Sequence, residues 1–393
     1  MNRPSRARWT RIAAVTITAV CVGYAPIAMT DIWPYADPQA PAIGQWLLAR
    51  AVSARYMADA LATRTGPYAH SLAALVVHTV LGGLLMLLGP AQLFTAVRRR
   101  LRLHRALGVV YALTVLVSMG GAAVYLARTA PKDAFGGEAF WIVLATILVG
   151  TVLSTLLGVL AAIGRLPAAH QRWMLLCYGY LMTAPLLRIE WMVLPWFFPG
   201  QSMTAINRIA LTHLGSLVAF GALLGSRALD RRAKVPGAEG SWAPVPVVVG
   251  AQLAGVAGIA WLGVELVGSG AEGRQQFLGY VVPYVACALV MVWRRAVAGR
   301  EGRAWAREEW GVHLTAMGLA PVFSAGAALV FQHALGVDEL TALTAGVGIG
   351  CGMLAFFATA VVAVRLMYAR EVVRRRPAAE TVTLAGSAVV PAA

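Results

Sequence analysis

The feature that most constrains this chain is a series of about ten apolar segments, each long enough to cross a lipid bilayer as an α-helix. A spanning helix needs about 20 apolar residues, because the hydrocarbon core is about 30 Å thick and each helical residue advances about 1.5 Å. The sequence therefore predicts an all-α, polytopic transmembrane helical bundle. The segments cover residues 9–30, 69–97, 104–127, 138–163, 172–196, 205–226, 244–267, 277–293, 310–333 and 340–367.

The composition agrees with this fold class. The 393 residues are 59% hydrophobic and 13% charged, with a mean hydropathy of +0.69. Soluble domains carry about 25% charged residues, so this chain has too little polar surface to cover a globule in water. We therefore expect the lipid bilayer to be its main partner. The net charge of +16 does not point to nucleic acid, because the basic clusters are not interleaved with aromatic stacking platforms.

The basic residues instead gather in every second connection between the apolar segments. Lys and Arg favour the cytoplasmic side of a membrane. The pattern predicts that both chain ends are cytoplasmic and that the protein resides in the bacterial cytoplasmic (inner) membrane as a multi-pass protein. The basic clusters fall within residues 3–11, 98–105, 165–172, 227–234, 294–307 and 370–376.

Two parts of the chain allow alternative interpretations. The first segment, with a basic start and small residues near Ala28, is either an uncleaved membrane helix, which we favour, or a signal peptide. The long connection 31–68 has apolar residues near helical spacing among Arg50, Arg55 and Arg64. It forms either an interfacial amphipathic helix or a solvated helix packed on the bundle.

Sequence motifs for catalysis or metal binding are missing. The four cysteines lie singly inside apolar segments, which fits neither a disulfide framework nor a zinc site. The chain has no Walker loop, HExxH, GxSxG or redox CxxC motif. The sequence therefore leaves open whether the protein is an enzyme and identifies no catalytic residue.

Ionisable residues within the segments form an outer level. His78, His213, Arg188 and Glu190 lie at similar depth in the predicted outer half of the bilayer. Arg188 alone costs about 2.5–3.5 kcal/mol at a helix centre, so we expect a partner on another helix or a bound anionic group. Pro185 is expected to kink the same helix and to free a backbone carbonyl nearby.

A second, inner level lies at the predicted cytoplasmic face. His104 is followed by Arg105, and His170 is followed two residues later by Arg172. Imidazoles facing each other at two depths are typical of a two-haem b-type cytochrome, in which arginines suit the haem propionates. The plainer interpretation is that these histidines are hydrogen-bonded between helices or lie near lipid headgroups.

The stretch from about residue 78 to residue 191 resembles the bacterial membrane-protein family catalogued as domain of unknown function 2306. The resemblance rests on His78 and the motifs Leu-Gly-Pro-Ala-Gln at 88–92, Leu-His-Arg-Ala-Leu-Gly-Val-Val-Tyr at 103–111 and His-Gln-Arg-Trp-Met at 170–174, with Tyr178 and Leu187-Arg188 beyond them. It implies a multi-helix membrane fold and no particular reaction.

Several functions are compatible with this pattern. The sequence favours a transporter or permease in which Arg188, Glu190, Arg105 and Arg172 bind a small substrate or anion. The alternative is electron transfer through non-covalent haem b, with axial ligands that would be His78, His213, His104 and His170. A packing scaffold and a lipid-modifying enzyme are the remaining hypotheses.

A segment rich in charge, proline and glycine suggests the internal organisation. It spans residues 230–241 and separates six apolar segments from four. We predict a six-helix region, 1–235, that contains the family-like core, and a four-helix region, 236–393, that ends in a basic cytoplasmic tail.

Overall fold

The structure is a computed structural model, and it describes residues 3–37, 39–228 and 242–386. The described part of the chain is helical and contains no strand. The predicted boundary at 235/236 lies outside the described residues. The α-helices are α1 (Arg3–Thr30), α2 (Ile43–Ala51), α3 (Ala54–His70), α4 (Leu72–Leu93), α5 (Thr95–Arg99), α6 (Leu101–Arg128), α7 (Gly137–Ile163), α8 (Pro167–Leu181), α9 (Thr183–Phe197), α10 (Met203–Ala228), α11 (Val245–Gly268), α12 (Gly270–Arg300), α13 (Ala304–Leu335) and α14 (Glu339–Gly386); η1 (Trp33–Tyr35) and η2 (Pro131–Asp133) are short 3-10 helices.

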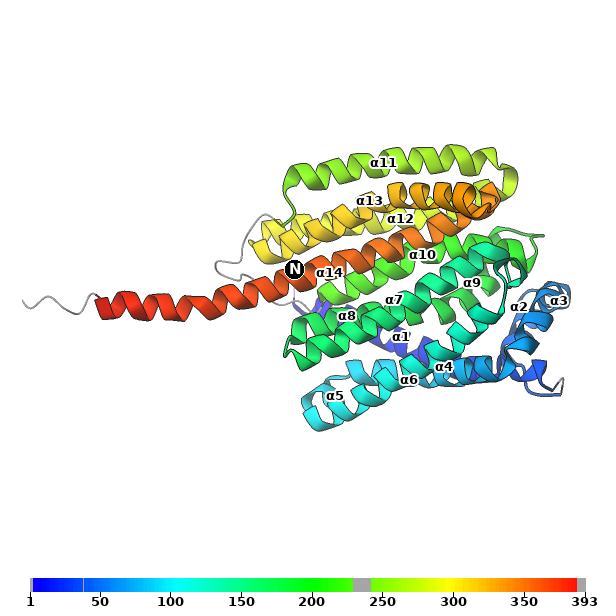
Figure 1. The fold of residues 1–393 in the computed structure, drawn as a ribbon, viewed down its shortest axis with the longest axis horizontal. Helices are drawn as coiled ribbons and strands as arrows, with labels where there is room; N and C mark the ends of the chain where they lie inside the picture. Colours follow the sequence, from blue (N-terminus) through cyan, green and yellow to red (C-terminus); the bar gives the residue numbers. More distant parts are fainter. Residues whose placement is uncertain (1–2, 38, 229–241, 387–393) are drawn as a thin grey trace, which may run out of the picture.

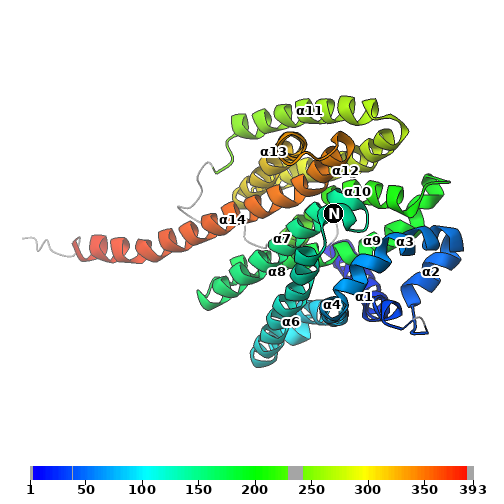
Figure 2. The same ribbon diagram turned by 45° about the vertical axis from the view of Figure 1, so that its right-hand side comes forward.

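The long helices run side by side as one bundle (Figures 1 and 2). Helices α2 and α3 lie across one end, which we call the outer end because the sequence predicts that it faces away from the cytoplasm. The start of α1 and the protruding end of α14 both lie at the opposite, inner end (Figure 1). Helix α1 therefore begins, and helix α14 ends, on the same side of the bundle, which agrees with the charge pattern.

Eight helices of the described chain are long and apolar enough to cross a membrane: α1, α4, α6, α7, α11, α12, α13 and α14. The segment 172–196 forms two shorter helices, α8 and α9, of 15 residues each. At about 22 Å each, neither crosses the bilayer alone. The segment 205–226 forms α10, which carries the polar residues Asn207, Arg208 and His213. All of the predicted segments are thus helical, and two of them depart from a simple apolar span.

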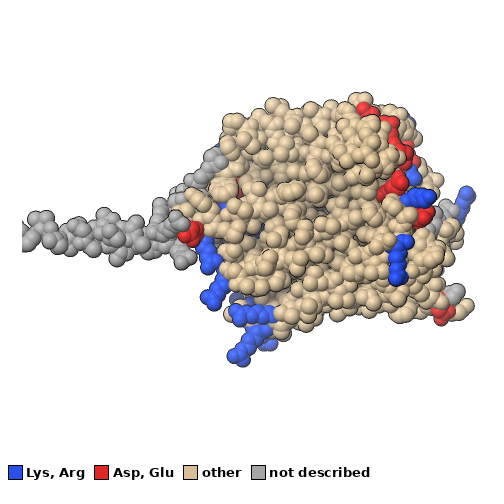
Figure 3. Space-filling view, viewed as in Figure 1, with Lys and Arg blue, Asp and Glu red and all other residues tan. Residues whose placement is uncertain are grey.

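The outer surface of the bundle is apolar between its two ends. Figure 3 shows charged side chains at both ends of the visible face and an uncharged band between them. Leu253 on α11 and Leu289 on α12 are 67% and 64% exposed, and many other large apolar side chains of the long helices are exposed as well. An apolar surface of this extent is unfavourable in water and matches the hydrocarbon core of a bilayer. The structure therefore supports a multi-pass membrane protein.

The long connection 31–68 is largely helical. Ser53 accepts a hydrogen bond from the backbone N–H of Tyr56 at 3.1 Å and so caps the start of α3. Leu48 on α2 and Met57 on α3 are buried in a core cluster that also contains Trp191 of α9. This packing fits a helix seated on the bundle better than one lying on the membrane surface.

The predicted six-helix and four-helix regions pack together. Helix α14 packs along α13 and also contacts α7, α8 and α10. One large core cluster includes Trp173 and Tyr180 of α8 together with Trp305 and Leu314 of α13 and Val362 of α14. The last four helices are therefore part of the same bundle as the family-like core.

Candidate functional site

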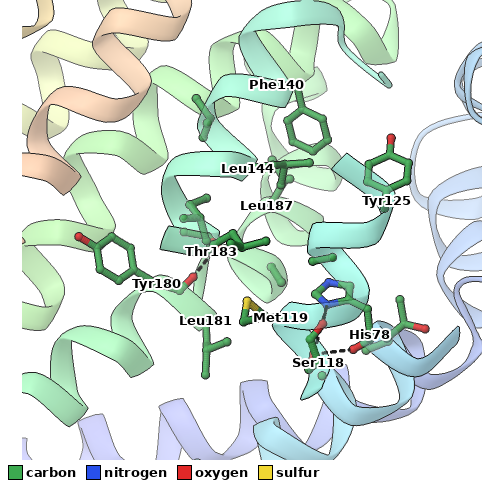
Figure 4. A pocket seen from close by; sticks show the side chains of 18 of the residues that line it. His78, Ser118, Met119, Tyr125, Phe140, Leu144, Tyr180, Leu181, Thr183 and Leu187 are labelled. Atoms are coloured by element: carbon green, nitrogen blue, oxygen red, sulfur yellow. Dashed lines mark hydrogen bonds between the residues drawn. The ribbon is translucent and has the colours of Figure 1, made fainter. Parts of the chain in front are cut away.

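A cavity of about 220 Å³ lies in the outer half of the bundle. Its wall comes from α1, α3, α4, α6, α7, α8, α9, α10 and α14. Most of the lining is apolar. Phe140, Leu144 and Leu187 lie on one side of the cavity, and Met119 and Leu181 lie on another (Figure 4). The cavity can therefore hold a small, mainly apolar group away from bulk water.

His78 on α4 is an ionisable residue on the cavity wall. Its Nδ1 lies 3.0 Å from the backbone oxygen of Ser118, and the Ser118 hydroxyl donates to the backbone oxygen of His78 at 2.9 Å (Figure 4). Because a carbonyl only accepts, Nδ1 must carry the hydrogen, which leaves a lone pair on Nε2. These bonds join α4 to α6 and fix the orientation of the ring.

Arg188 lies on the same wall and has an acidic partner. Its Nη2 is 3.0 Å from Oδ2 of Asp31, which follows the end of α1. The two side chains are 23% and 15% exposed, and both line the cavity. The guanidinium also stacks on Trp191 at 4.8 Å, and Arg64 stacks on the same indole at 4.8 Å. Asp31, which sequence reasoning left in a loop, neutralises Arg188, so this wall carries both signs of charge.

Glu190 and His213 form a separate pair. Glu190 Oε1 lies 2.6 Å from Nδ1 of His213 on α10, and neither residue lines the cavity. Residues two apart on a helix point to nearly opposite sides, so α9 presents Arg188 to the cavity and Glu190 to α10. The four residues of the predicted outer level therefore divide into two groups, His78 with Arg188 and Glu190 with His213.

The break between α8 and α9 places these groups. Pro185 has no N–H to donate to the carbonyl of Leu181, where α8 ends, and this explains the predicted kink. The Thr183 hydroxyl donates to the backbone oxygen of Tyr180 at 2.6 Å (Figure 4). Thr183 and Ala184 line the cavity. The positive end of the α9 dipole therefore lies at the site.

Three tyrosine rings contact one another at the outer end of the site. The ring centroid of Tyr68 lies 5.1 Å from that of Tyr35 and 5.5 Å from that of Tyr125, both in edge-to-face geometry. Tyr68 and Tyr125 also line the cavity. Burial raises the pKa of Tyr68 on α3, so its phenol stays neutral and acts as a hydrogen-bonding group.

The inner level brings two predicted residues together. The ring centroids of His104 on α6 and His170 on α8 are 6.5 Å apart, with ring planes at 80°. Nδ1 of His170 lies 2.8 Å from the backbone oxygen of Gly158 on α7 and so carries the hydrogen. Arg105, the neighbour of His104, is exposed. Within the described residues, no group of three or more His, Cys, Asp or Glu side chains is arranged to hold a metal ion.

Arg172 belongs to a buried ionic network and faces neither histidine level. Its Nε and Nη2 donate to the two carboxylate oxygens of Glu309 on α13 at 3.0 and 3.1 Å. Arg365 on α14 binds Glu308, lies 3.9 Å from Glu309 and stacks on Trp305 at 3.4 Å. Sequence reasoning missed this network. The signal was the acidic pair Glu308-Glu309 in a cytoplasmic connection whose other charged residues are mostly basic.

Comparison with known proteins gives one match. Residues 75–224 match the model of the family described as a predicted membrane protein, DUF2306. The matched region covers α4 to α10 apart from a few terminal residues, and it includes both histidine levels. This confirms the resemblance that the motifs between residues 78 and 191 indicated. Neither a curated protein nor a solved structure matches the chain.

Proposed function

We propose that this multi-pass membrane protein is a permease for a small zwitterion with an apolar or aromatic side chain. The observation that carries the proposal is the Arg188–Asp31 pair on the wall of an apolar cavity within the membrane. A guanidinium binds a carboxylate, and a carboxylate binds an ammonium group. A ligand with both groups can replace the internal pair without leaving either protein charge alone.

The charge of the wall narrows the class of ligand. A simple anion would have to compete with Asp31 for Arg188, and a simple cation would have to compete with Arg188 for Asp31. Either would leave one buried charge without a partner, which is costly in a low-dielectric site. The sequence alone suggested an anionic substrate for Arg188. With Asp31 beside Arg188, we propose a ligand of zero net charge instead.

The size of the cavity limits the side chain of the ligand. A cavity of about 150 Å³ holds a benzene ring, and this one is about 220 Å³. One ring with a short polar chain fits this space. Such a zwitterion does not cross hydrocarbon unaided, since isolated charges are costly there, so a polar site inside a helical bundle suits transport. The interrupted α8–α9 segment beside the site is also typical of transporters.

Uptake into proteoliposomes tests the proposal with three probes that share one ring. Radiolabelled L-phenylalanine carries both charges, phenylacetate carries the carboxylate and phenethylamine carries the ammonium group. We expect uptake of phenylalanine by the wild type to exceed liposome background. In Arg188→Met, uptake should fall at least about tenfold, which corresponds to a loss of about 1.4 kcal/mol of binding or barrier free energy. Asp31→Asn should reduce phenylalanine uptake and improve competition by phenylacetate, because it frees Arg188.

The matched control is Glu272→Gln. Glu272 forms an ion pair with Arg208 at the outer end, and the side chains of Arg208 and Glu272 are 30% and 31% exposed. Glu272 does not line the cavity. Its loss should leave uptake unchanged. Uptake of phenylalanine at background level, or equal uptake by wild type, Arg188→Met and Asp31→Asn, would reject the proposed zwitterion site.

The second candidate function is electron transfer through haem, favoured by the geometry of His104 and His170. We take metal–nitrogen bonds of about 2.0–2.1 Å. Two imidazoles on opposite sides of a metal then have ring centroids about 6 Å apart, whereas two imidazoles of a tetrahedral site have ring centroids about 5 Å apart. The observed 6.5 Å fits opposite ligands. The Gly158 carbonyl holds the His170 tautomer with Nε2 free to bind, as is usual for metal-bound histidine.

Absorption spectra of the purified protein test this second candidate. Haem b between His104 and His170 would give sharp bands after dithionite reduction, and His170→Ala would remove them. Bands that survive in His104→Ala and His170→Ala but vanish in His78→Ala or His213→Ala would move the haem to the outer level. A protein that stays colourless after haem supplementation would leave the permease as the sole proposal.

A further inference from the structure

Two sulfur atoms from distant parts of the chain meet near the middle of the membrane. Sγ of Cys21 on α1 lies 3.6 Å from Sδ of Met182, the residue between α8 and α9. The hydroxyl oxygen of Tyr178 lies 2.8 Å from the same Sγ. Cys21 is fully buried. This contact is separate from the Arg188–Asp31 pair and from the His104–His170 pair.

The surroundings of this contact are rich in sulfur. Cys21 belongs to a core cluster of nineteen residues, six of which carry sulfur. This is one third of the cluster, whereas 17 of the 393 residues of the chain carry sulfur. The six come from α1, α4, α6, α8 and the residue that follows α8, and they are Cys21, Met86, Met119, Cys177, Met174 and Met182.

We propose that Cys21 and Met182 bind a soft monovalent metal ion, Cu(I), inside the membrane. Thiolate and thioether sulfurs are the ligands that select Cu(I). Charge favours the same ion, because one thiolate and one Cu(I) sum to zero. A divalent ion with one thiolate would leave a net positive charge in a buried apolar cluster, which is unfavourable.

The geometry allows both sulfurs to bind one ion. With metal–sulfur bonds of about 2.3 Å, two sulfurs 3.6 Å apart subtend roughly 100° at the metal. This bent arrangement leaves one side of the ion open to a third donor. Binding forms a sulfur–copper bond and breaks the S–H bond of Cys21, and the proton leaves to solvent. The Tyr178 hydroxyl then donates to the thiolate.

The test is a competition titration of the purified full-length protein with Cu(I) against bicinchoninate under reducing conditions. We expect one tightly held Cu(I) per chain. Cys21→Ser and Met182→Leu should each weaken the affinity at least about tenfold; both changes nearly preserve side-chain volume. X-ray absorption at the copper edge should show sulfur neighbours at about 2.2–2.3 Å.

Cys287→Ser is the matched control. Cys287 is a partly buried thiol on α12 that packs against a different core cluster. This variant should bind Cu(I) like the wild type. A wild type that binds no Cu(I), or folded Cys21→Ser and Met182→Leu variants that keep wild-type affinity, would overturn the proposal. An equal loss in Cys287→Ser would also overturn it, since binding would then reflect thiols in general. Thermal unfolding of each variant establishes that it is folded.

Discussion

At the scale of single residues, the costly side chains of this protein meet partners on other helices. Arg188 binds Asp31, Glu190 binds His213, and Arg172 binds Glu309. The partners of Arg188 and Arg172 lie more than a hundred residues away along the chain. An isolated charge in hydrocarbon costs several kcal/mol. The need for a partner can therefore be read from one residue, but the identity of that partner depends on how the helices pack.

The Arg172–Glu309 pair gives a prediction about stability. Its two side chains are only 8% and 0% exposed. Arg172→Met should lower the free energy of unfolding by about 3–5 kcal/mol, because Glu309 keeps a buried charge with a weaker partner, Arg365. Adding Glu309→Gln should recover most of this loss, since the remaining Arg365–Glu308 pair is balanced. Unfolding by sodium dodecyl sulfate in mixed micelles measures the effect.

The partly exposed Arg208–Glu272 pair provides the comparison. Arg208→Met should cost less than about 1 kcal/mol, because exposed ion pairs contribute little. Similar costs for Arg172→Met and Arg208→Met would contradict the buried network at the inner end of α8, α13 and α14.

At the scale of elements, small residues decide how closely the helices approach. A Cβ at Gly121 on α6 would lie 2.4 Å from the backbone oxygen of Ala74 on α4. The neighbouring Gly120 has nothing within 4 Å of the same position. Of these two adjacent glycines, only Gly121 is required for the contact between α4 and α6, and that contact also positions His78 against Ser118.

This difference predicts opposite effects for two adjacent substitutions. Gly121→Ala should destabilise the protein by about 1–3 kcal/mol, because the two backbones must move apart. Gly120→Ala should stabilise it by up to about 1 kcal/mol, since alanine is the better helix former and has room. The same micelle unfolding measurement applies. Equal effects of the two changes would mean that α4 and α6 do not touch at Gly121.

At the scale of the whole molecule, the two ends of the bundle differ in charge. The inner end carries the described basic connections, the start of α1 and the end of α14, while the outer end carries acidic residues as well as basic ones (Figures 1 and 3). The bias of Lys and Arg toward the cytoplasm orients the entire bundle. The cavity and the Arg188–Asp31 pair would then lie nearer the outer face.

Reporter fusions check this orientation. A fluorescent protein fused to the C-terminus should fold and fluoresce, because it would remain in the cytoplasm. Alkaline phosphatase inserted after Asp338 should be active, since that connection would face outward. The same insertion after Glu301 should be inactive. An active insertion at Glu301 with an inactive one at Asp338 would invert the topology and place the cavity near the cytoplasm.

The sequence by itself determined that most of the chain lies in lipid, that the fold is helical, and how many apolar segments it has. The reason is that the length and charge of each segment are local properties, and they decide whether the segment can lie in a bilayer. It also singled out His78, Arg188, His104 and His170 as candidate site residues, since polar residues are conspicuous in apolar runs, and it predicted the kink at Pro185.

Only the tertiary structure decided which of these residues meet. It paired Arg188 with Asp31, separated His213 from His78 and brought Cys21 to Met182. It also showed that Arg172 holds α13 and does not line the cavity. The physical reason is that hydrocarbon offers no hydrogen bonds, so every buried charge must find its partner in the packing of helices far apart in the chain.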